Sequence, residues 1–263
     1  MSQPCWCGSL DYQIIISNQA VRCRHCGLVR TEPEPAEQKK DAGYYVDPAD
    51  YLYRLNNLKL WQQFAKDVLK IIKKYKSQGA LLDVGANIGV LVAEAVKNGY
   101  DAQGLDICQE SVEAGNKLFN LGQRLTFAAL PETNWTNQFE IIVYNHVLEH
   151  LKDSNRELTA AYQALKAGGL IYLAVPNFNS VWRRVLGRRW RGLATNQHYW
   201  QFEATSLQKI LEHNHFKVLK TYRNRNILYN LTFTPAGLAK ILLVAWSKLF
   251  KQGDNLIILA QKN

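Results

Sequence analysis

The sequence lacks any apolar run as long as the roughly 20 residues that a membrane-spanning helix needs. Its first residues, Met-Ser-Gln-Pro-Cys-Trp-Cys, have neither the basic start nor the apolar core of a secretory signal peptide. We therefore expect a cytoplasmic protein, where thiols stay reduced and paired cysteines more often bind metal than form disulfides. The apolar fraction of 47% is ordinary for a globular protein and excludes wholesale disorder.

Acidic residues are too few to balance the basic ones, with 22 Asp and Glu against 32 Lys and Arg, so the net charge is +10. This charge favours an anionic partner, such as nucleic acid, a phosphorylated substrate or a membrane surface, and does not choose among them. A chain of 263 residues has room for one large α/β domain with a small appendage, but not for two full-sized domains.

Four of the five cysteines lie near the N-terminus, in two pairs that are each followed by glycine. They are Cys5, Cys7, Cys23 and Cys26. Zinc takes four tetrahedral ligands, so we interpret the pairs as a structural zinc site. The first pair is one residue shorter than the common Cys-x-x-Cys. Disulfides or loose thiols are less favoured, and a redox role least, because such a motif belongs inside a βαβ unit. The fifth, Cys108, is interpreted as a small buried side chain.

The chain divides into three predicted parts: a zinc-ribbon-like module over 1–35, a linker and lead-in helix over 36–79, and a large domain over 80–263. The Glu- and Pro-rich stretch 31–35 is typical of a linker. Apolar residues at helical spacing predict one helix over 50–76.

From Ala80 onward, short apolar runs alternate with helical segments, which predicts βαβ units and a mostly parallel sheet. The predicted strands are Leu81–Val84, Ala102–Leu105, Leu125–Phe127, Ile141–Tyr144, Leu170–Val175, Phe216–Thr221 and Leu256–Ala260. The fold class is therefore α/β, a Rossmann-like sheet of seven strands behind a small zinc-binding module.

A glycine-rich loop, Asp83-Val84-Gly85-Ala86-Asn87-Ile88-Gly89, lies where the first of these strands turns into a helix. Glycines let the backbone pass close to a ligand, and the helix N-terminus offers N–H groups. Val90 stands where a dinucleotide fingerprint needs its third glycine. Asp106, at the end of the next strand, could accept two hydrogen bonds from a ribose diol.

This loop resembles the acid-x-Gly-x-Gly-x-Gly motif of class I S-adenosylmethionine methyltransferases, with Asn87 at the middle glycine. Five later segments are similar to the ubiquinone-biosynthesis-type group of these enzymes: 139–151, 165–170, 175–177, 187–193 and 198–202. The resemblance runs from Leu81 to the C-terminus, and an N-terminal cysteine module also occurs in the group. It implies S-adenosylmethionine as cofactor, held by Asp83, Gly85, Asn87, Gly89 and Asp106.

Two departures from the family pattern concern the cofactor. Family members often have an acid after the third strand that meets the adenine amine, whereas Phe127-Ala128-Ala129-Leu130 offers none. Asn87 should be tolerated, because asparagine visits left-handed backbone conformations more easily than most residues.

Three histidines are the candidates for positioning or deprotonating the methyl acceptor: His146, His150 and, in reserve, His198. His146 and His150 are four apart, so at the start of a helix they would share a face. The resemblance also implies a divalent metal held by His146, Glu149 and His150. The alternative is that Glu149 and His150 only cap the local helix.

The segment from Trp182 to Arg191 carries five arginines and two tryptophans, and no acid occurs between Phe178 and Phe202. Arginine binds phosphate, and tryptophan is common at membrane interfaces, so we favour contact of Arg183–Arg191 with an anionic substrate or lipid headgroup at the membrane periphery. A later apolar stripe over 238–249 could do the same, although packing on its own core is the favoured alternative.

We therefore predict a methyltransferase acting on oxygen or carbon of a small-molecule, sugar or lipid-linked acceptor. One alternative is an RNA methyltransferase that binds through the zinc module and the arginines. The segment Asn145-His146-Val147-Leu148 is not the Asn/Asp-Pro-Pro-Tyr/Phe of many base-methylating enzymes, which makes a nucleic-acid partner less favoured. A second alternative is a non-catalytic interaction protein that retains the fold.

Overall fold

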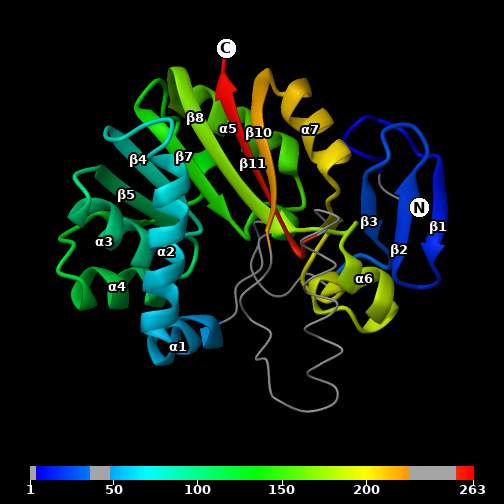
Figure 1. Cartoon of the computed structure of the whole chain (residues 1–263), viewed down its shortest axis with the longest axis horizontal. Coiled ribbons are helices and arrows are strands. Elements are labelled where there is room, and N and C mark those ends of the chain that lie inside the picture. Colours follow the sequence, from blue (N-terminus) through cyan, green and yellow to red (C-terminus); the bar gives the residue numbers. More distant parts are fainter. Residues whose placement is uncertain (1–3, 36–47, 225–252) are drawn as a thin grey trace.

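The main sheet has seven strands and is mostly parallel, as the sequence predicted. The computed structural model describes residues 4–35, 48–224 and 253–263 (Figure 1). The strand order is β10-β11-β8-β7-β4-β5-β6, and only β11 runs antiparallel to its neighbours. The strands are β4 (Ala80–Val84), β5 (Asp101–Asp106), β6 (Leu125–Phe127), β7 (Phe139–Asn145), β8 (Leu165–Pro176), β10 (Phe216–Asn224) and β11 (Asn255–Lys262). Each overlaps one of the seven predicted segments, and β8 begins at Leu165 instead of the predicted Leu170.

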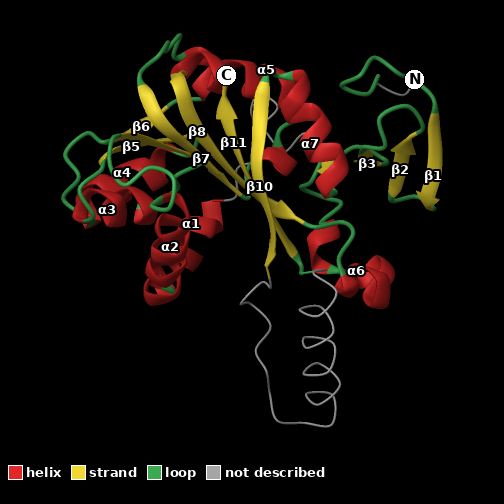
Figure 2. Ribbon diagram, turned by 45° about the horizontal axis from the view of Figure 1, so that its top comes forward, coloured by secondary structure: helices red, strands yellow, loops and turns green. Residues whose placement is uncertain are grey.

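Helices cover both faces of this sheet, because successive residues of a buried strand point to opposite sides. The helices are α1 (Pro48–Asn56), α2 (Leu58–Ile72), α3 (Val90–Lys97), α4 (Gln109–Leu118), α5 (Ser154–Ala164), α6 (Val181–Leu186) and α7 (Ala204–His213). They lie on both sides of the strands in Figure 2. Leu81 of β4 packs into one apolar core with α2 and α3, and Leu82 packs into the other with α5 and α7. Short 3-10 turns are η1 (Leu130–Glu132), η2 (Leu148–His150), η3 (Gly187–Arg189) and η4 (Arg191–Leu193).

The lead-in helix is broken, and the prediction of one continuous helix over 50–76 was wrong. Helix α1 ends at Asn56, α2 begins at Leu58, and Asn57 between them leaves the helical conformation with φ −120° and ψ 30°. The Asn57 side chain donates to the Tyr53 carbonyl at 2.9 Å. Asparagine competes with helical hydrogen bonding in this way, and the apolar spacing alone could not reveal it.

The N-terminal module forms a second, four-stranded sheet in the order β1-β2-β3-β9. Its strands are β1 (Tyr12–Ile16), β2 (Ala20–Cys23), β3 (Val29–Thr31) and β9 (Trp200–Gln201). The last strand comes from the large domain, and Arg30 pairs with Trp200 in antiparallel register. Arg22 and Glu203 add an ion pair of 2.7 Å across the same junction. The division of the chain at residue 35 stays a prediction.

Among the described residues, no helix is both long and apolar enough to cross a membrane. The late apolar stripe over 238–249 lies outside the described residues.

Candidate active site

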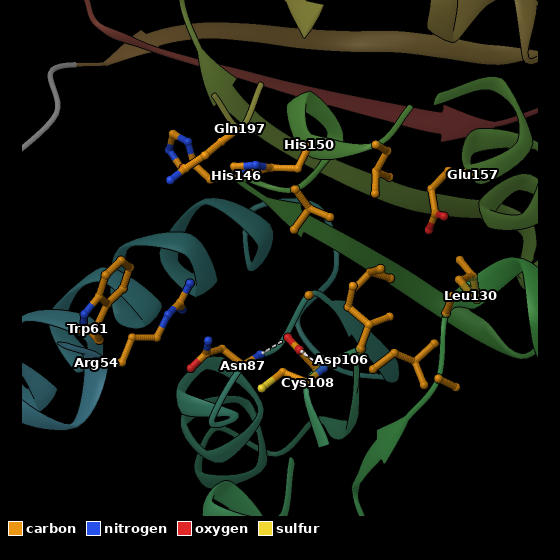
Figure 3. A pocket seen from close by; sticks show the side chains of 18 residues that line it. Arg54, Trp61, Asn87, Asp106, Cys108, Leu130, His146, His150, Glu157 and Gln197 are labelled. Carbon is orange, nitrogen blue, oxygen red and sulfur yellow. Dashed lines mark hydrogen bonds between the residues drawn. The ribbon is translucent and has the colours of Figure 1, made fainter. Parts of the chain in front are cut away.

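A cavity of about 430 Å³ opens where β4, β5 and β7 reach their carboxyl ends (Figure 3). Ligands of open α/β sheets bind at this edge. The lining contains cofactor-loop residues, two of the predicted histidines and side chains from α1, α2 and α5. It comprises Arg54, Trp61, Val84, Gly85, Asn87, Leu105, Asp106, Ile107, Cys108, Ala128, Ala129, Leu130, His146, Val147, His150, Leu151, Glu157 and Gln197.

The loop after β4 has the left-handed turns that its sequence requires. Gly85, Asn87 and Gly89 have φ values of 74°, 52° and 73°. The expectation that asparagine tolerates this conformation at position 87 is confirmed. Gly85 and Asn87 line the cavity, whereas a side chain at Gly89 would lie 2.7 Å from Leu125. Gly89 therefore serves the packing beneath the loop.

The Asp106 carboxylate lies on the cavity wall and is oriented by backbone donors. Its Oδ2 accepts from the Asn87 N–H at 2.6 Å, and its Oδ1 accepts from the Cys108 N–H at 2.9 Å. A carboxylate has further acceptor capacity on both oxygens, so this geometry suits a vicinal diol.

Asp83 lies behind the loop and does not line the cavity. It borders an adjoining cleft with Arg54 and Asn145. Burial raises the pKa of Asp83 to about 7, an effect that Arg54 opposes and Asp106 reinforces. A role in holding the cofactor would therefore act through the loop or through its charge.

His146 follows β7 directly and has a left-handed backbone with φ 57°. Such a conformation is costly for a residue other than glycine and is often found at functional sites. Its Nδ1 lies 3.1 Å from Oε1 of Glu149. The predicted α-helix at this point is wrong, since residues 148–150 form the 3-10 turn η2, but His146 and His150 both face the cavity.

Glu149, His150 and His198 form a cluster whose ligand atoms all lie within 4.8 Å of one another. The two imidazole rings meet edge to face with centroids 4.6 Å apart. His198 is 7% exposed, and its Nδ1 lies 3.0 Å from the Gly192 carbonyl. The predicted metal set had His146 in place of His198. The fold brings His198 to the cluster and leaves His146 beside Glu149.

The ionisation of this cluster follows from its burial and its charges. Burial and, to a smaller extent, neighbouring His150 lower the pKa of His198 to about 4. Burial by itself raises the pKa of Glu149. The hydrogen bond from His146 and the three surrounding imidazoles outweigh this effect and lower the pKa of Glu149 to about 2. Glu149 is therefore an anion among histidines.

The sequence does not identify four polar or aromatic side chains of the cavity lining as site residues: Arg54, Trp61, Glu157 and Gln197. The Arg54 guanidinium stacks 4.3 Å from the Trp61 ring centroid, and both belong to the helices that precede the sheet. Trp61 is one of the apolar residues at helical spacing in the segment 50–76, and this spacing indicates only a buried helical face. The sequence places Gln197 next to the predicted site residue His198, and this was the only indication that Gln197 lies in the site. The sequence gives no such indication for Glu157.

The family model of a methyltransferase domain matches residues 55–221, which is more than half of the chain. The chain belongs to this methyltransferase family. The ubiquinone biosynthesis O-methyltransferase of Bordetella avium (strain 197N) is 29% identical over 105 residues, which are 38% of this chain and 43% of that protein. The chain thus spans less than half the length of that relative. The protein of the same name from Bartonella tribocorum (strain CIP 105476 / IBS 506) is 24% identical over 198 residues, 70% of this chain and 73% of that protein.

Solved structures share the fold. A S-adenosylmethionine-dependent methyltransferase from Archaeoglobus fulgidus superposes with a TM-score of 0.57 at 18% identity, covering 80% of this chain and 99% of that one. The 1,6-didemethyltoxoflavin-N1-methyltransferase of Burkholderia thailandensis, solved with S-adenosylhomocysteine, gives 0.54 at 13% identity, covering 96% and 99%. The family is that of the methyltransferase domain, and the fold is the one seen in solved S-adenosylmethionine-dependent methyltransferases.

The methyltransferase domain carries the cysteine cluster at its N-terminal side. All five thiols of the described residues are reduced, and the sulfurs of Cys5, Cys7, Cys23 and Cys26 lie within 4.8 Å of one another. Cys5 and Cys26 are 3.4 Å apart, and Cys7 and Cys23 are 3.6 Å apart. Tetrahedral zinc with Zn–S bonds of about 2.3 Å requires about 3.8 Å between sulfurs. The four thiols therefore fit zinc with a small adjustment.

The arginine-rich segment of the methyltransferase presents arginines but not its tryptophans. Trp182 and Trp190 are buried in a small core with Phe178 and Leu193, and Trp190 donates to Asp254 at 2.8 Å. The expectation that these two tryptophan rings meet a membrane interface is wrong, because both rings are buried in this core. Arg188 and Arg189 are exposed.

Proposed function

We propose that this methyltransferase moves the methyl group of S-adenosylmethionine to an oxygen or carbon of a small-molecule, sugar or lipid-linked acceptor. The observation that carries the proposal is the Asp106 carboxylate, fixed by two backbone N–H groups on the wall of a cavity that also presents His146 and His150. The O-methyltransferase names of the curated relatives favour oxygen as the acceptor atom.

The charges along the cavity support one orientation of the cofactor. Asp106 would accept from the ribose hydroxyls, and Arg54, on one side of it in Figure 3, would bind the methionine carboxylate. When bound, the cofactor supplies an electrophilic methyl group on a sulfonium. The residues that would then face the methyl group are His146 and His150, which lie above Asp106 in the same view.

His146 is the proposed base for a hydroxyl acceptor. Glu149, beside Nδ1 of His146, would fix the tautomer with hydrogen on Nδ1 and leave Nε2 to take the acceptor proton. Glu149 is an anion in this site, so it also stabilises the imidazolium that results. Methyl transfer is an in-line displacement, and alignment of the acceptor would supply much of the remaining rate.

Glu149, His150 and His198 would hold a divalent metal ion. Oε2 of Glu149 is buried without a hydrogen-bond partner, which is the state expected of a carboxylate oxygen that binds a cation. The Gly192 carbonyl beside Nδ1 of His198 favours hydrogen there and leaves Nε2 as a ligand. The ion would polarise the acceptor hydroxyl and lower its pKa.

The four N-terminal cysteines would hold a structural zinc ion. Their buried, mutually close sulfurs support this, as do Gly8 and Gly27, whose φ values of 79° and 84° form the turn after each pair. The exposed Arg188 and Arg189 support an anionic group on the acceptor or on a membrane that delivers it.

Calorimetric titration of S-adenosylmethionine into zinc-loaded protein tests the cofactor. We expect micromolar binding that Asp106→Asn weakens at least tenfold, about 1.4 kcal/mol, because one acceptor oxygen is replaced by a donor. Asp101→Asn, at the exposed start of the same strand, is the matched control and should bind normally. No binding to the folded wild-type protein would overturn the proposal. A labelled methyl donor and His146→Gln then test transfer.

A further inference from the structure

The adenine end of the proposed cofactor site lacks the acid that the family resemblance leads us to expect after the third strand of the sheet. In this chain β6 is followed by Ala128, Ala129 and Leu130, and all three line the cavity. These side chains could pack against a purine ring but could accept no hydrogen bond from its exocyclic amine. If no other residue replaced the missing acid, the site would recognise the purine base of the cofactor by its shape alone.

We propose that Glu157 of α5 supplies this carboxylate and makes the site specific for a 6-aminopurine. The proposal rests on the proposed function. Glu157 lies on a different element, about thirty residues further along the chain, yet its side chain lines the same cavity as Ala128 and Leu130. Helix α5 packs against η1, the turn that contains Leu130, and this contact brings the two segments together.

The order of the side chains along the cavity puts Glu157 where the purine base of the cofactor would lie. Figure 3 shows Arg54 and Trp61 on one side, Asp106 and Asn87 between, and Leu130 with Glu157 on the other side. With the ribose at Asp106 and the methionine carboxylate at Arg54, the purine must extend toward Leu130. The Glu157 carboxylate points toward Leu130 in this view, where the amino edge of the base would lie.

Glu157 is held for this role by a buried hydrogen bond. It is 2% exposed, and its Oε1 accepts from the Tyr144 hydroxyl at 2.9 Å. An apolar residue would fill this position between sheet and helix at lower cost, because a buried carboxylate loses its hydration. A carboxylate can accept an N–H from an exocyclic amine in addition to the tyrosine O–H, whereas it repels a carbonyl oxygen at the same place. In a water-poor pocket such a charge-assisted bond is strong.

The experiment compares S-adenosylhomocysteine with S-inosylhomocysteine, in which a carbonyl oxygen replaces the 6-amino group. Calorimetry on zinc-loaded wild-type protein should show at least tenfold tighter binding of the amino form, about 1.4 kcal/mol. In Glu157→Gln the ratio should fall to within about threefold, because a carboxamide can turn either its oxygen or its NH₂ to the base. Glutamine still accepts from Tyr144, so the helix should stay in place.

Glu132→Gln is the matched control, since Glu132 lies on η1 beside Leu130 but is exposed and outside the cavity lining. It should keep the wild-type ratio. Glu157→Asp, which retains the charge, should keep the preference for the amino form with weaker binding overall. If wild-type protein binds S-adenosylhomocysteine and Glu157→Gln keeps its full preference, this inference alone is overturned. Wild-type protein that binds neither compound would overturn the proposed function, and the inference with it.

Discussion

The residue with the most unusual surroundings is Glu149. It is 1% exposed, one oxygen lies beside His146, and the other is buried without a hydrogen-bond partner. Three imidazoles surround it and keep it ionised, with a pKa of about 2. A carboxylate and two histidines converging on one point are ligands that suit Mn²⁺ and Mg²⁺ as well as zinc, whereas four thiolates select zinc.

Mn²⁺ binding tests this site separately from the cysteines. Zinc-loaded protein should bind one Mn²⁺, followed by loss of its free-ion paramagnetic resonance signal. Glu149→Gln and His198→Gln should each weaken binding at least tenfold, because each removes one of three ligands. His213→Gln, which changes a histidine at the end of α7, should have no effect. Absence of Mn²⁺ binding, or equal binding by all variants, would show that the cluster is only a hydrogen-bonded core.

The place of a residue in the site could be predicted where the residue belongs to a motif of fixed spacing. It could not be predicted where the residue comes from a distant element. Asp106 follows the loop at a fixed interval, and its bonds to Asn87 and Cys108 are local consequences of that spacing. Glu157 belongs to a helix whose exposed and buried positions look ordinary in the sequence. Its place in the cavity depends on how α5 packs against η1, which no local pattern encodes.

At the scale of elements, the strands were the predictable part. The central strands β4, β7, β8 and β11 contain short apolar runs that are buried on both faces, so their signal does not depend on their partners. The start of the helix after β7 was predicted wrongly, because the left-handed His146 and the turn η2 depend on backbone bonds to a neighbouring strand. The His146 N–H donates to the Ala174 carbonyl of β8 at 2.8 Å.

Helix α4 supports the cofactor loop through one close contact. A side chain at Gly115 would lie 2.4 Å from the Ile88 carbonyl oxygen, and Ile88 stands between Asn87 and Gly89 in the loop. Alanine normally favours a helix over glycine by about 1 kcal/mol. Here the overlap with a backbone atom cannot be relieved by rotating a side chain. The cost of overpacking, about 1–3 kcal/mol, therefore exceeds the gain in helix propensity.

Gly115→Ala should therefore lower the free energy of unfolding and weaken S-adenosylhomocysteine binding at least tenfold, measured by denaturant titration and calorimetry. Glu113→Ala, at an exposed position of the same helix, is the control and should change neither quantity appreciably. A Gly115→Ala protein that is more stable than wild type and binds normally would mean that helix propensity prevails and that α4 does not position the loop.

For the whole molecule, the N-terminal sheet and the large domain are packed as one structure. Cys5, Cys23 and Leu28 belong to the same apolar core as Leu82 of the central strand. Strand β9 pairs with β3 and directly follows the segment that carries His198. The Tyr199 N–H donates to the Glu149 carbonyl at 2.8 Å. The two short strands β3 and β9 therefore connect the N-terminal module that holds the cysteine cluster to the segment that holds the histidine cluster.

Loss of zinc should consequently damage the histidine cluster more than the cofactor cavity. In a Cys7→Ser/Cys26→Ser protein we expect zinc to be lost and the midpoint of thermal unfolding to fall by roughly 5 °C or more, since 1 kcal/mol moves it by about 2–4 °C in a domain of this size. Mn²⁺ affinity should fall at least tenfold because His198 depends on β9. S-adenosylhomocysteine affinity should stay within about threefold, because Asp106 and its loop belong to the far side of the sheet.

His25→Gln, which changes an exposed histidine beside the cysteine cluster, is the control and should keep zinc and both affinities. Equal loss of both affinities would indicate global unfolding, and loss of neither would show that the module and the site are independent.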